Sequence, residues 1–150
     1  MTTIDTVRKY LSTDTGLAVI STAQADGRVL SSLVNCGLID HPVSGEVRLA
    51  MVSGGGAARL GHIRRGSEVT VAVTRGWNWA GVTGPAELVG PVDSASGLGS
   101  DATRLLLREI FEAAGGTHDD WEEFDRAMAD DGRTAVLVSP ERIIGNSPTA

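Results

Sequence analysis

Strict alternation of apolar and polar residues marks the clearest β-strand of the chain, "SEVTVAVT" at residues 67–74. A second signal is the dipeptide Asp26-Gly27, which favours a tight hairpin turn between the strand-forming segments on either side of it. Residues 77–91 also read as a strand, in which Gly84-Pro85 predicts a break or a bulge. The same criteria predict further strands at 17–22, 28–36, 46–52, 133–139 and 141–146.

Apolar residues spaced three or four positions apart predict helices at 3–12, 57–65, 102–114 and 117–130. Thr117 is the expected N-cap of the last helix, and the acidic residues that follow it suit the positive end of a helix dipole. The residues expected to face the core from these helices are Ile4, Val7, Leu11, Leu60, Ile63, Leu106, Ile110, Ala113, Trp121, Phe124 and Met128.

The order of these elements defines the expected fold class. Strands come first, two helices follow, and strands return at the end, so the regular βαβ alternation of a doubly wound parallel sheet is missing. The pattern predicts a mainly β (α+β) protein, with a mostly antiparallel barrel of six to seven strands and helices packed outside it. A chain of 150 residues is most simply one domain, spanning 1–150.

Composition narrows the classes of partner. The formal net charge of −6 argues against general nucleic-acid binding, which requires a basic face. The single cysteine, Cys36, excludes an intrachain disulfide and fits a reducing compartment. The chain start lacks the pattern of a signal peptide, and no apolar run approaches the ~20 residues of a membrane span. The expected location is the cytoplasm.

Positive charge gathers directly after a glycine turn. Gly54–Gly56 end an apolar run, and Arg59, His62, Arg64 and Arg65 follow closely. The glycine spacing of a P-loop is present, but the Lys and the Ser or Thr that this motif needs are not. The stretch therefore indicates either an anion site, in which Arg59 at a helix start binds a phosphate, or an ordinary solvated helix face.

Other candidates for chemistry carry weaker signals. Trp77 and Trp79 are expected on one face of a strand, where they either cover the core or line a cleft for a flat ring. Cys36 is expected to be a buried structural thiol, and His62 a surface or partly buried side chain. Residues 118–120, His-Asp-Asp, favour a helix start over a metal site, because adjacent helical positions point in different directions.

Several stretches together resemble a known family. They are "SSLVN", "SGGGAARLGHIRRGSEVTVAV", "GWNWAGVTGPAELVGP", "LREIFEAAGGTHDDWEEFDRAM" and "RTAVLVSPERIIGN". This combination resembles the pyridoxamine 5′-phosphate oxidase-like split β-barrel superfamily. Within it, the chain is most similar to the flavin/deazaflavin oxidoreductases of actinobacteria, in the branch that uses coenzyme F-420. The resemblance extends over residues 15–146.

The resemblance implies a cofactor site. Arg59 stands where many relatives have Lys and would bind the cofactor phosphate, together with Ser53 and the backbone of 55–58. Positions 32–35 would lie along the tricyclic ring, and positions 79–80 would flank the same groove. The cofactor-binding residues implied in this way are Ser32, Val34, Asn35, Ser53, Gly55, Ala57, Ala58, Arg59, Arg64, Trp79 and Ala80.

The resemblance also implies an activity and a partner. The expected function is hydride transfer from reduced F-420 to an activated unsaturated small molecule, in a homodimer whose second subunit helps to close the cofactor groove. FMN is the alternative cofactor. The chain end "SPERIIGNSPTA" lacks the Arg-x-His of pyridoxamine phosphate oxidases, which argues against that activity. A third reading is a non-catalytic binder of a cofactor or a haem-type ligand.

Overall fold

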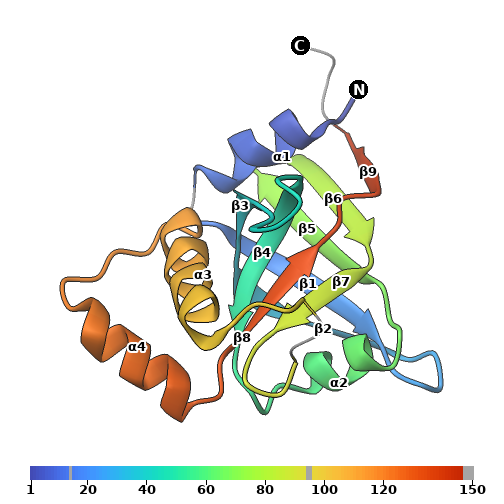
Figure 1. The fold of residues 1–150 in the computed structure, drawn as a ribbon. Coiled ribbons are helices and arrows are strands. Elements are labelled where there is room, and N and C mark those ends of the chain that lie inside the picture. Colours follow the sequence, from blue (N-terminus) through green and yellow to red (C-terminus); the bar gives the residue numbers. More distant parts are fainter. Residues whose placement is uncertain (14, 94–95, 147–150) are drawn as a thin grey trace.

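The computed structural model of the protein describes residues 1–13, 15–93 and 96–146. Within these ranges the chain forms four helices and nine strands (Figure 1). The helices are α1 (Ile4–Leu11), α2 (Ala58–Arg64), α3 (Ser100–Ala113) and α4 (Trp121–Asp130). The strands are β1 (Leu17–Ala23), β2 (Val29–Asn35), β3 (Gly37–Asp40), β4 (Val47–Ser53), β5 (Val69–Arg75), β6 (Asn78–Gly84), β7 (Ala86–Val89), β8 (Thr134–Val138) and β9 (Arg142–Gly145).

Two antiparallel sheets face each other and form the barrel. One has five strands in the order β2-β1-β5-β6-β9, and the other has four in the order β3-β4-β8-β7. The inward-facing residues of both sheets form the main core, which includes Ile20, Met51, Val71, Val82 and Val136. The predicted fold class is therefore confirmed, with nine strands in place of the six to seven expected.

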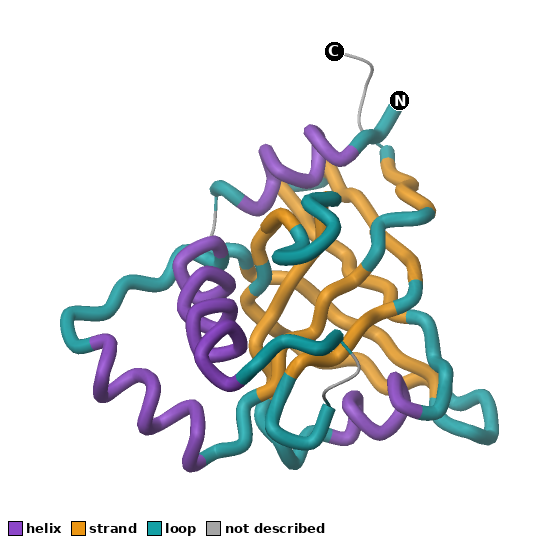
Figure 2. The backbone as a smooth tube through the Cα atoms, in the orientation of Figure 1, coloured by secondary structure: helices purple, strands orange, loops and turns teal. Residues whose placement is uncertain are grey.

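Helices close both ends of the barrel. Figures 1 and 2 show α1 over one end of the barrel and α2 at the other. Val7, Tyr10 and Leu11 of α1 and Leu60 and Ile63 of α2 belong to the barrel core. The periodicity of the two segments predicted these core residues with the exception of Tyr10. Within the part of the chain that the structure describes, no helix is long and apolar enough to cross a membrane.

A second core lies on the outer side of the four-stranded sheet. There α3 packs Leu106, Leu107 and Ile110 against the sheet, and Phe124 of α4 joins them. All five residues of β8 are consequently buried, since the barrel covers one face of this strand and the helices cover the other. Such burial on both faces suits a strand made of "TAVLV".

Two local predictions for the helices were wrong. Ala113 is exposed, and Ala114 turns into the interior in its place. The N-cap of α4 is Asp120 rather than Thr117, because the Asp120 carboxylate accepts a hydrogen bond from the Glu123 amide at 3.2 Å. Residues 117–120 therefore form the connection between α3 and α4. The predicted apolar face of α4 is correct, since Phe124 is buried and Trp121 and Met128 pack beside it.

The break predicted at Gly84-Pro85 is the point where the chain passes between the two sheets. β6 ends at Gly84 in the five-stranded sheet, and β7 begins at Ala86 in the four-stranded sheet. A Cβ atom on Gly84 would lie 1.8 Å from the carbonyl oxygen of Ser139, so only glycine fits. The other additional strand, β3, has four residues and pairs with β4.

Replacing Gly84 should destabilise the fold. In Gly84→Ala the new methyl group meets backbone, which cannot rotate away, so we expect the free energy of unfolding to fall by about 1–3 kcal/mol. Urea denaturation measures this change. Gly56→Ala is the control, since a Cβ there has no neighbour within 4 Å, and its stability should stay within about 0.5 kcal/mol of wild type. Equal stability of the two variants would contradict the close contact.

The thiol of Cys36 should be inert in the folded protein. Cys36 is fully buried between β2 and β3, and this burial raises the pKa of its thiol to about 12. Because the thiolate is the reactive form, iodoacetamide at pH 8 should label the protein only after it unfolds in denaturant. The chain has no other cysteine, so mass spectrometry of the intact protein gives an unambiguous count. Rapid stoichiometric labelling of the folded protein would contradict this burial.

Candidate functional site

The side chain of Arg59 joins three elements at one end of the barrel. From α2, its guanidinium donates one hydrogen bond to Ser53 Oγ on β4 at 2.9 Å and another to Ser32 Oγ on β2 at 2.7 Å. Ser53 itself is buried. Arg59 is half-buried, which argues against the alternative of an ordinary solvated helix face at this residue. The three polar residues that the resemblance implied do lie together.

The charge of Arg59 has no counter-charge among the described residues. No carboxylate in these ranges forms an ion pair with it, and its hydrogen-bond partners are neutral hydroxyls. Burial lowers the pKa of the guanidinium, although arginine remains charged at neutral pH. The other basic residues without an ion pair in these ranges are exposed: Arg8, Lys9, Arg65, Arg75, Arg126 and Arg142. Such a half-buried cation without a counterion can take an anion as its partner.

Arg59 lies at the polar end of a cavity of about 540 Å³. This volume is in the usual range for small-molecule sites. Gly54 and Arg133 share the polar end, and an apolar wall extends from it over β2, α3 and α4. The apolar lining residues include Leu33, Val34, Ile110, Phe111, Phe124 and Met128. The cavity therefore combines a cationic end with an apolar surface that suits a flat ring.

Two aromatic residues, Phe111 and Phe124, line the cavity on the helix side. Phe111, His118, Trp121 and Phe124 form a mutually contacting cluster, with ring centroids of Phe111 and Phe124 only 5.0 Å apart. The Arg108 guanidinium lies over the Trp121 ring at 5.5 Å from its centroid. This cluster fastens α4 to α3 beside the cavity. Its role in the site was not predicted, although the helical spacing of Trp121 and Phe124 was.

Asn35 is a second polar group of the cavity. Its side-chain amide donates to the Thr15 carbonyl oxygen at 2.8 Å, which fixes the orientation of the carboxamide. Its Oδ1 atom accepts no hydrogen bond from the residues that the structure describes, so an acceptor remains for a ligand. Val34, the neighbouring predicted residue, also lines the cavity. Both residues thus lie at the cavity, and their contact with a ring stays a prediction.

The backbone around the glycine turn is less available than expected. The Gly55 amide donates to the Asp131 carbonyl oxygen at 3.2 Å, and the Ala57 amide donates to the Gly54 carbonyl oxygen at 3.1 Å. These two donors cannot also bind a phosphate without giving up those bonds. Ala58 is exposed at the first residue of α2, which is only seven residues long. The side chains, and not this backbone, supply the cationic character of the site.

Three predicted site residues lie elsewhere. Arg64 forms a two-point ion pair with Asp93, at 3.0 Å and 2.7 Å, and does not line the cavity. Ala80 is fully buried in the barrel core, so its side chain cannot contact a ligand in the cavity. Trp79 lies on the outer face of the five-stranded sheet, where β1 and β5 separate its strand from β2. Within one chain, Trp79 and Arg59 do not share a groove.

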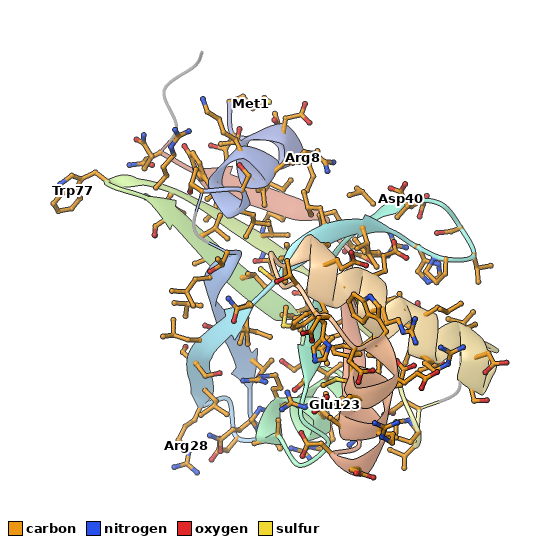
Figure 3. The ribbon with its side chains drawn as sticks, turned by 90° about the vertical axis from the view of Figure 1, so that its left-hand side faces the viewer. Met1, Arg8, Arg28, Asp40, Trp77 and Glu123 are labelled. Carbon is orange, nitrogen blue, oxygen red and sulfur yellow. The ribbon has the colours of Figure 1, made fainter. Side chains whose placement is uncertain are left out.

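Trp77 does not share a strand face with Trp79. It lies in the turn between β5 and β6 and is 96% exposed, and Figure 3 shows it at the tip of this hairpin. The predicted strand at 77–91 included Trp77 wrongly, because β6 begins only at Asn78. The Asn146 side chain clasps the same hairpin, donating to the Trp77 carbonyl oxygen and accepting from the Trp79 amide.

Each histidine has a structural partner. His62 is buried, contrary to expectation, with Nδ1 at 2.9 Å from Thr22 Oγ1. His41 accepts backbone hydrogen bonds from Val43 and Ser44 at Nδ1, so Nε2 carries the proton that it donates to Glu87 at 2.8 Å. His118, in the aromatic cluster, accepts a hydrogen bond from the Asp120 amide. In the described ranges no three His, Cys, Asp or Glu residues group as metal ligands would.

Solved structures with little sequence in common have a similar fold. A conserved hypothetical protein from Mycobacterium tuberculosis superimposes with a TM-score of 0.69 at 13% identity, over 97% of this chain and 84% of that one. A pyridoxamine 5′-phosphate oxidase-related, FMN-binding protein from Nostoc punctiforme gives 0.62 at 14% identity, over 95% and 81%. An F420 reductase gives 0.59 at 14% identity, over 85% and 88%. No protein-family model and no curated protein matches the chain.

These similarities and the two antiparallel sheets agree on the architecture. The superpositions extend over 97% and 95% of this chain, so they include its five- and four-stranded sheets and the helices around them. At such low identities the agreement concerns the fold. The chain therefore has a split β-barrel fold like that of these solved structures.

Proposed function

We propose that the protein is a coenzyme F-420-dependent oxidoreductase that binds the cofactor phosphate at Arg59. When bound, the reduced deazaflavin would supply a hydride for an activated unsaturated small molecule. The observation that carries the proposal is the uncompensated, half-buried charge of Arg59 at one end of a cavity with an apolar wall. The F420 reductase of the same fold and the resemblance of residues 53–73 favour the deazaflavin.

The cavity residues fit the parts of such a cofactor. Arg59 offers a planar fork of donors, which matches the oxygens of a phosphate. Val34 and Leu33 from β2 provide an apolar surface for the ring, and the free Oδ1 of Asn35 can accept a hydrogen bond from a ring N–H group. The chain would bind and orient the cofactor and exclude water. Its three histidines and its cysteine hold structural positions instead.

FMN is the second candidate cofactor. An FMN-binding protein shares the fold, and the cationic end of the cavity suits an FMN phosphate equally. Titration of the purified protein with F-420, FMN and haem under identical conditions distinguishes these ligands by their absorption and fluorescence. Turnover of reduced F-420 with a panel of enones and quinones then separates an enzyme from a non-catalytic binder. Tight FMN binding without F-420 binding would contradict the proposed cofactor.

We also propose that two copies of the chain pair through the outer face of the five-stranded sheet. One row of residues in register across all five strands is entirely apolar: Leu33, Val19, Ala72, Gly81 and Ile144. Three of them are large and exposed, with Leu33 at 66% and Ile144 at 57%. Leu33 also lines the cavity, so a second copy on this face would lie beside the cavity and help to close it.

Replacing Arg59 should weaken cofactor binding. A hydrogen bond to a charged group contributes about 1.5–3 kcal/mol, so Arg59→Ala should raise the dissociation constant about ten- to a hundredfold. Arg59→Lys should recover part of the affinity, since it restores the charge without the fork. The affinity of wild type should fall as salt rises, and that of Arg59→Ala should fall less. Titrations at low and high salt measure these differences.

Arg65→Ala is the matched control for this experiment. Arg65 follows α2 directly, is exposed, and has no ion pair among the described residues, so its loss should leave the dissociation constant unchanged. If Arg59→Ala binds as tightly as Arg65→Ala at both salt concentrations, the arginines after the glycine turn form only a solvated helix face. Because Arg59 also bridges β2 and β4, the stability of each variant is measured alongside its affinity.

A charge on the outer face should separate the two copies. Light scattering of wild type should return twice the 15.6 kDa mass of one chain. Val19→Glu should return the mass of one chain, because the carboxylate would be buried without a partner in the interface. Val43→Glu, in the exposed loop after β3, is the control and should remain dimeric. A wild-type protein that is monomeric at micromolar concentration would contradict the paired arrangement.

A further inference from the structure

We infer that Arg133 is a second anion-binding residue of this cavity and binds, together with Arg59, the phosphate group of its ligand. The assignment rests on the proposed function, and it concerns a residue to which neither the sequence pattern nor the resemblance gave a role. Arg133 precedes β8 and is 74 positions away from Arg59 in sequence, yet both side chains line the same cavity.

Two turns meet to bring Arg133 into place. The glycine turn after β4 lies against the turn between α4 and β8, where the Gly55 amide donates to the Asp131 carbonyl oxygen. A Cβ atom on Gly55 would lie 2.7 Å from the Gly132 carbonyl oxygen, so a side chain at Gly55 would push the turns apart. Gly132 has φ +60°, a conformation that favours glycine. Gly55 and Gly132 thus allow the backbones of the two turns to lie in contact.

The pairing of β4 with β8 then brings Arg133 beside the glycine turn, next to the residue that Arg59 contacts. Ser53, which accepts a hydrogen bond from Arg59, is directly opposite Thr134 in this pair of strands. Arg133 immediately precedes Thr134, and its guanidinium carbon lies 4.0 Å from the position of a Cβ atom on Gly54. Gly54 also lines the cavity, so the Arg133 guanidinium stands over the glycine turn at the polar end.

The donors of Arg133 are largely unused. Its Nε atom is 2.5 Å from Asp131 Oδ2, but no hydrogen bond with acceptable geometry forms, and this Nε is a buried polar atom without a hydrogen-bond partner. Its terminal amino groups donate to no residue in the described ranges. Structural arginines of this protein differ: Arg64 and Arg108 each direct two nitrogens at one carboxylate, those of Asp93 and Asp125.

The charges leave room for one anion. Arg59 and Arg133 are the charged residues among the described lining of the cavity, and Asp131 is the carboxylate paired with Arg133. Two cations and one carboxylate leave one positive charge uncompensated at the polar end. A phosphate placed there would compensate this charge and accept hydrogen bonds from the free amino groups of Arg133. Asp131, whose side chain is 56% exposed, would then be a competitor for Arg133 and not its required partner.

The test is a titration of four variants with F-420 and with FMN. Arg133→Ala should bind the accepted cofactor about tenfold more weakly, Arg133→Lys should recover part of the loss, and Asp131→Asn should bind more tightly than wild type. The control is Arg126→Ala on α4, an exposed arginine without an ion pair in the described ranges, which should bind as wild type does. Unchanged affinity of Arg133→Ala, or weaker binding of Asp131→Asn, would overturn the assignment.

A second readout separates this inference from the proposed function. If wild type binds neither cofactor, the proposed function fails, and pyrophosphate then decides the role of Arg133. Pyrophosphate should raise the melting temperature of wild type and of Arg126→Ala by the same amount, and that of Arg133→Ala by less. Equal shifts in wild type and Arg133→Ala, or no shift in wild type, would overturn the assignment. Melting temperatures without ligand show whether each variant folds.

Discussion

The barrel interior is filled by its own side chains, and this constraint determines where the protein can bind anything. Residues such as Ile20, Leu49 and Met51 are inaccessible to solvent in the space between the sheets. A small barrel of this size leaves no lumen for a flavin-sized molecule. Binding must therefore take place on the surface of the barrel, where α3 and α4 stand away from β2 and leave the cavity. The helix that closes this end of the barrel, α2, brings Arg59 to the mouth of that cavity.

Positive charge distinguishes the polar end of the cavity from its apolar wall. The chain carries a net charge of −6, so carboxylates are plentiful, and most arginines that are not fully exposed have one within reach. Arg59 has hydroxyl partners instead, and Arg133 has a carboxylate in poor hydrogen-bonding geometry. Leaving a half-buried cation uncompensated costs stability, because the surroundings solvate it less well than water. An anion that binds there removes this cost, so the stability that the free protein lacks contributes to the affinity for the anion.

Sequence patterns predicted the parts of the structure that depend on near neighbours. Alternation and the Asp26-Gly27 turn gave the β1–β2 hairpin, in which Gly27 has φ +88°. The Gly84-Pro85 break was correct because its cause, a strand that must leave one sheet, is marked locally by residues unsuited to a ladder. Helix ends shifted by a few residues, as the Asp120 cap shows. The four-residue β3 was missed because it is too short to show a period.

The site was predictable only in part. The grouping of Ser32, Ser53 and Arg59 came from family resemblance, since no local pattern connects three different elements. Arg133 was missed because its position depends on the pairing of β4 with β8, which no periodicity reveals. The place of Trp79 relative to Arg59 within one chain was not predictable for a related reason. Alternation places it on one face of a strand, but the order of strands in the sheet decides what that face meets.

The central claim is that the uncompensated charge of Arg59 binds the phosphate of a flavin-type cofactor. A crystal structure of the protein grown with F-420 or FMN tests it most directly. The account predicts a phosphate oxygen within about 3 Å of the Arg59 guanidinium and the cofactor ring against Val34 and Asn35. A cofactor bound elsewhere, with Arg59 still donating only to Ser53 and Ser32, would contradict it.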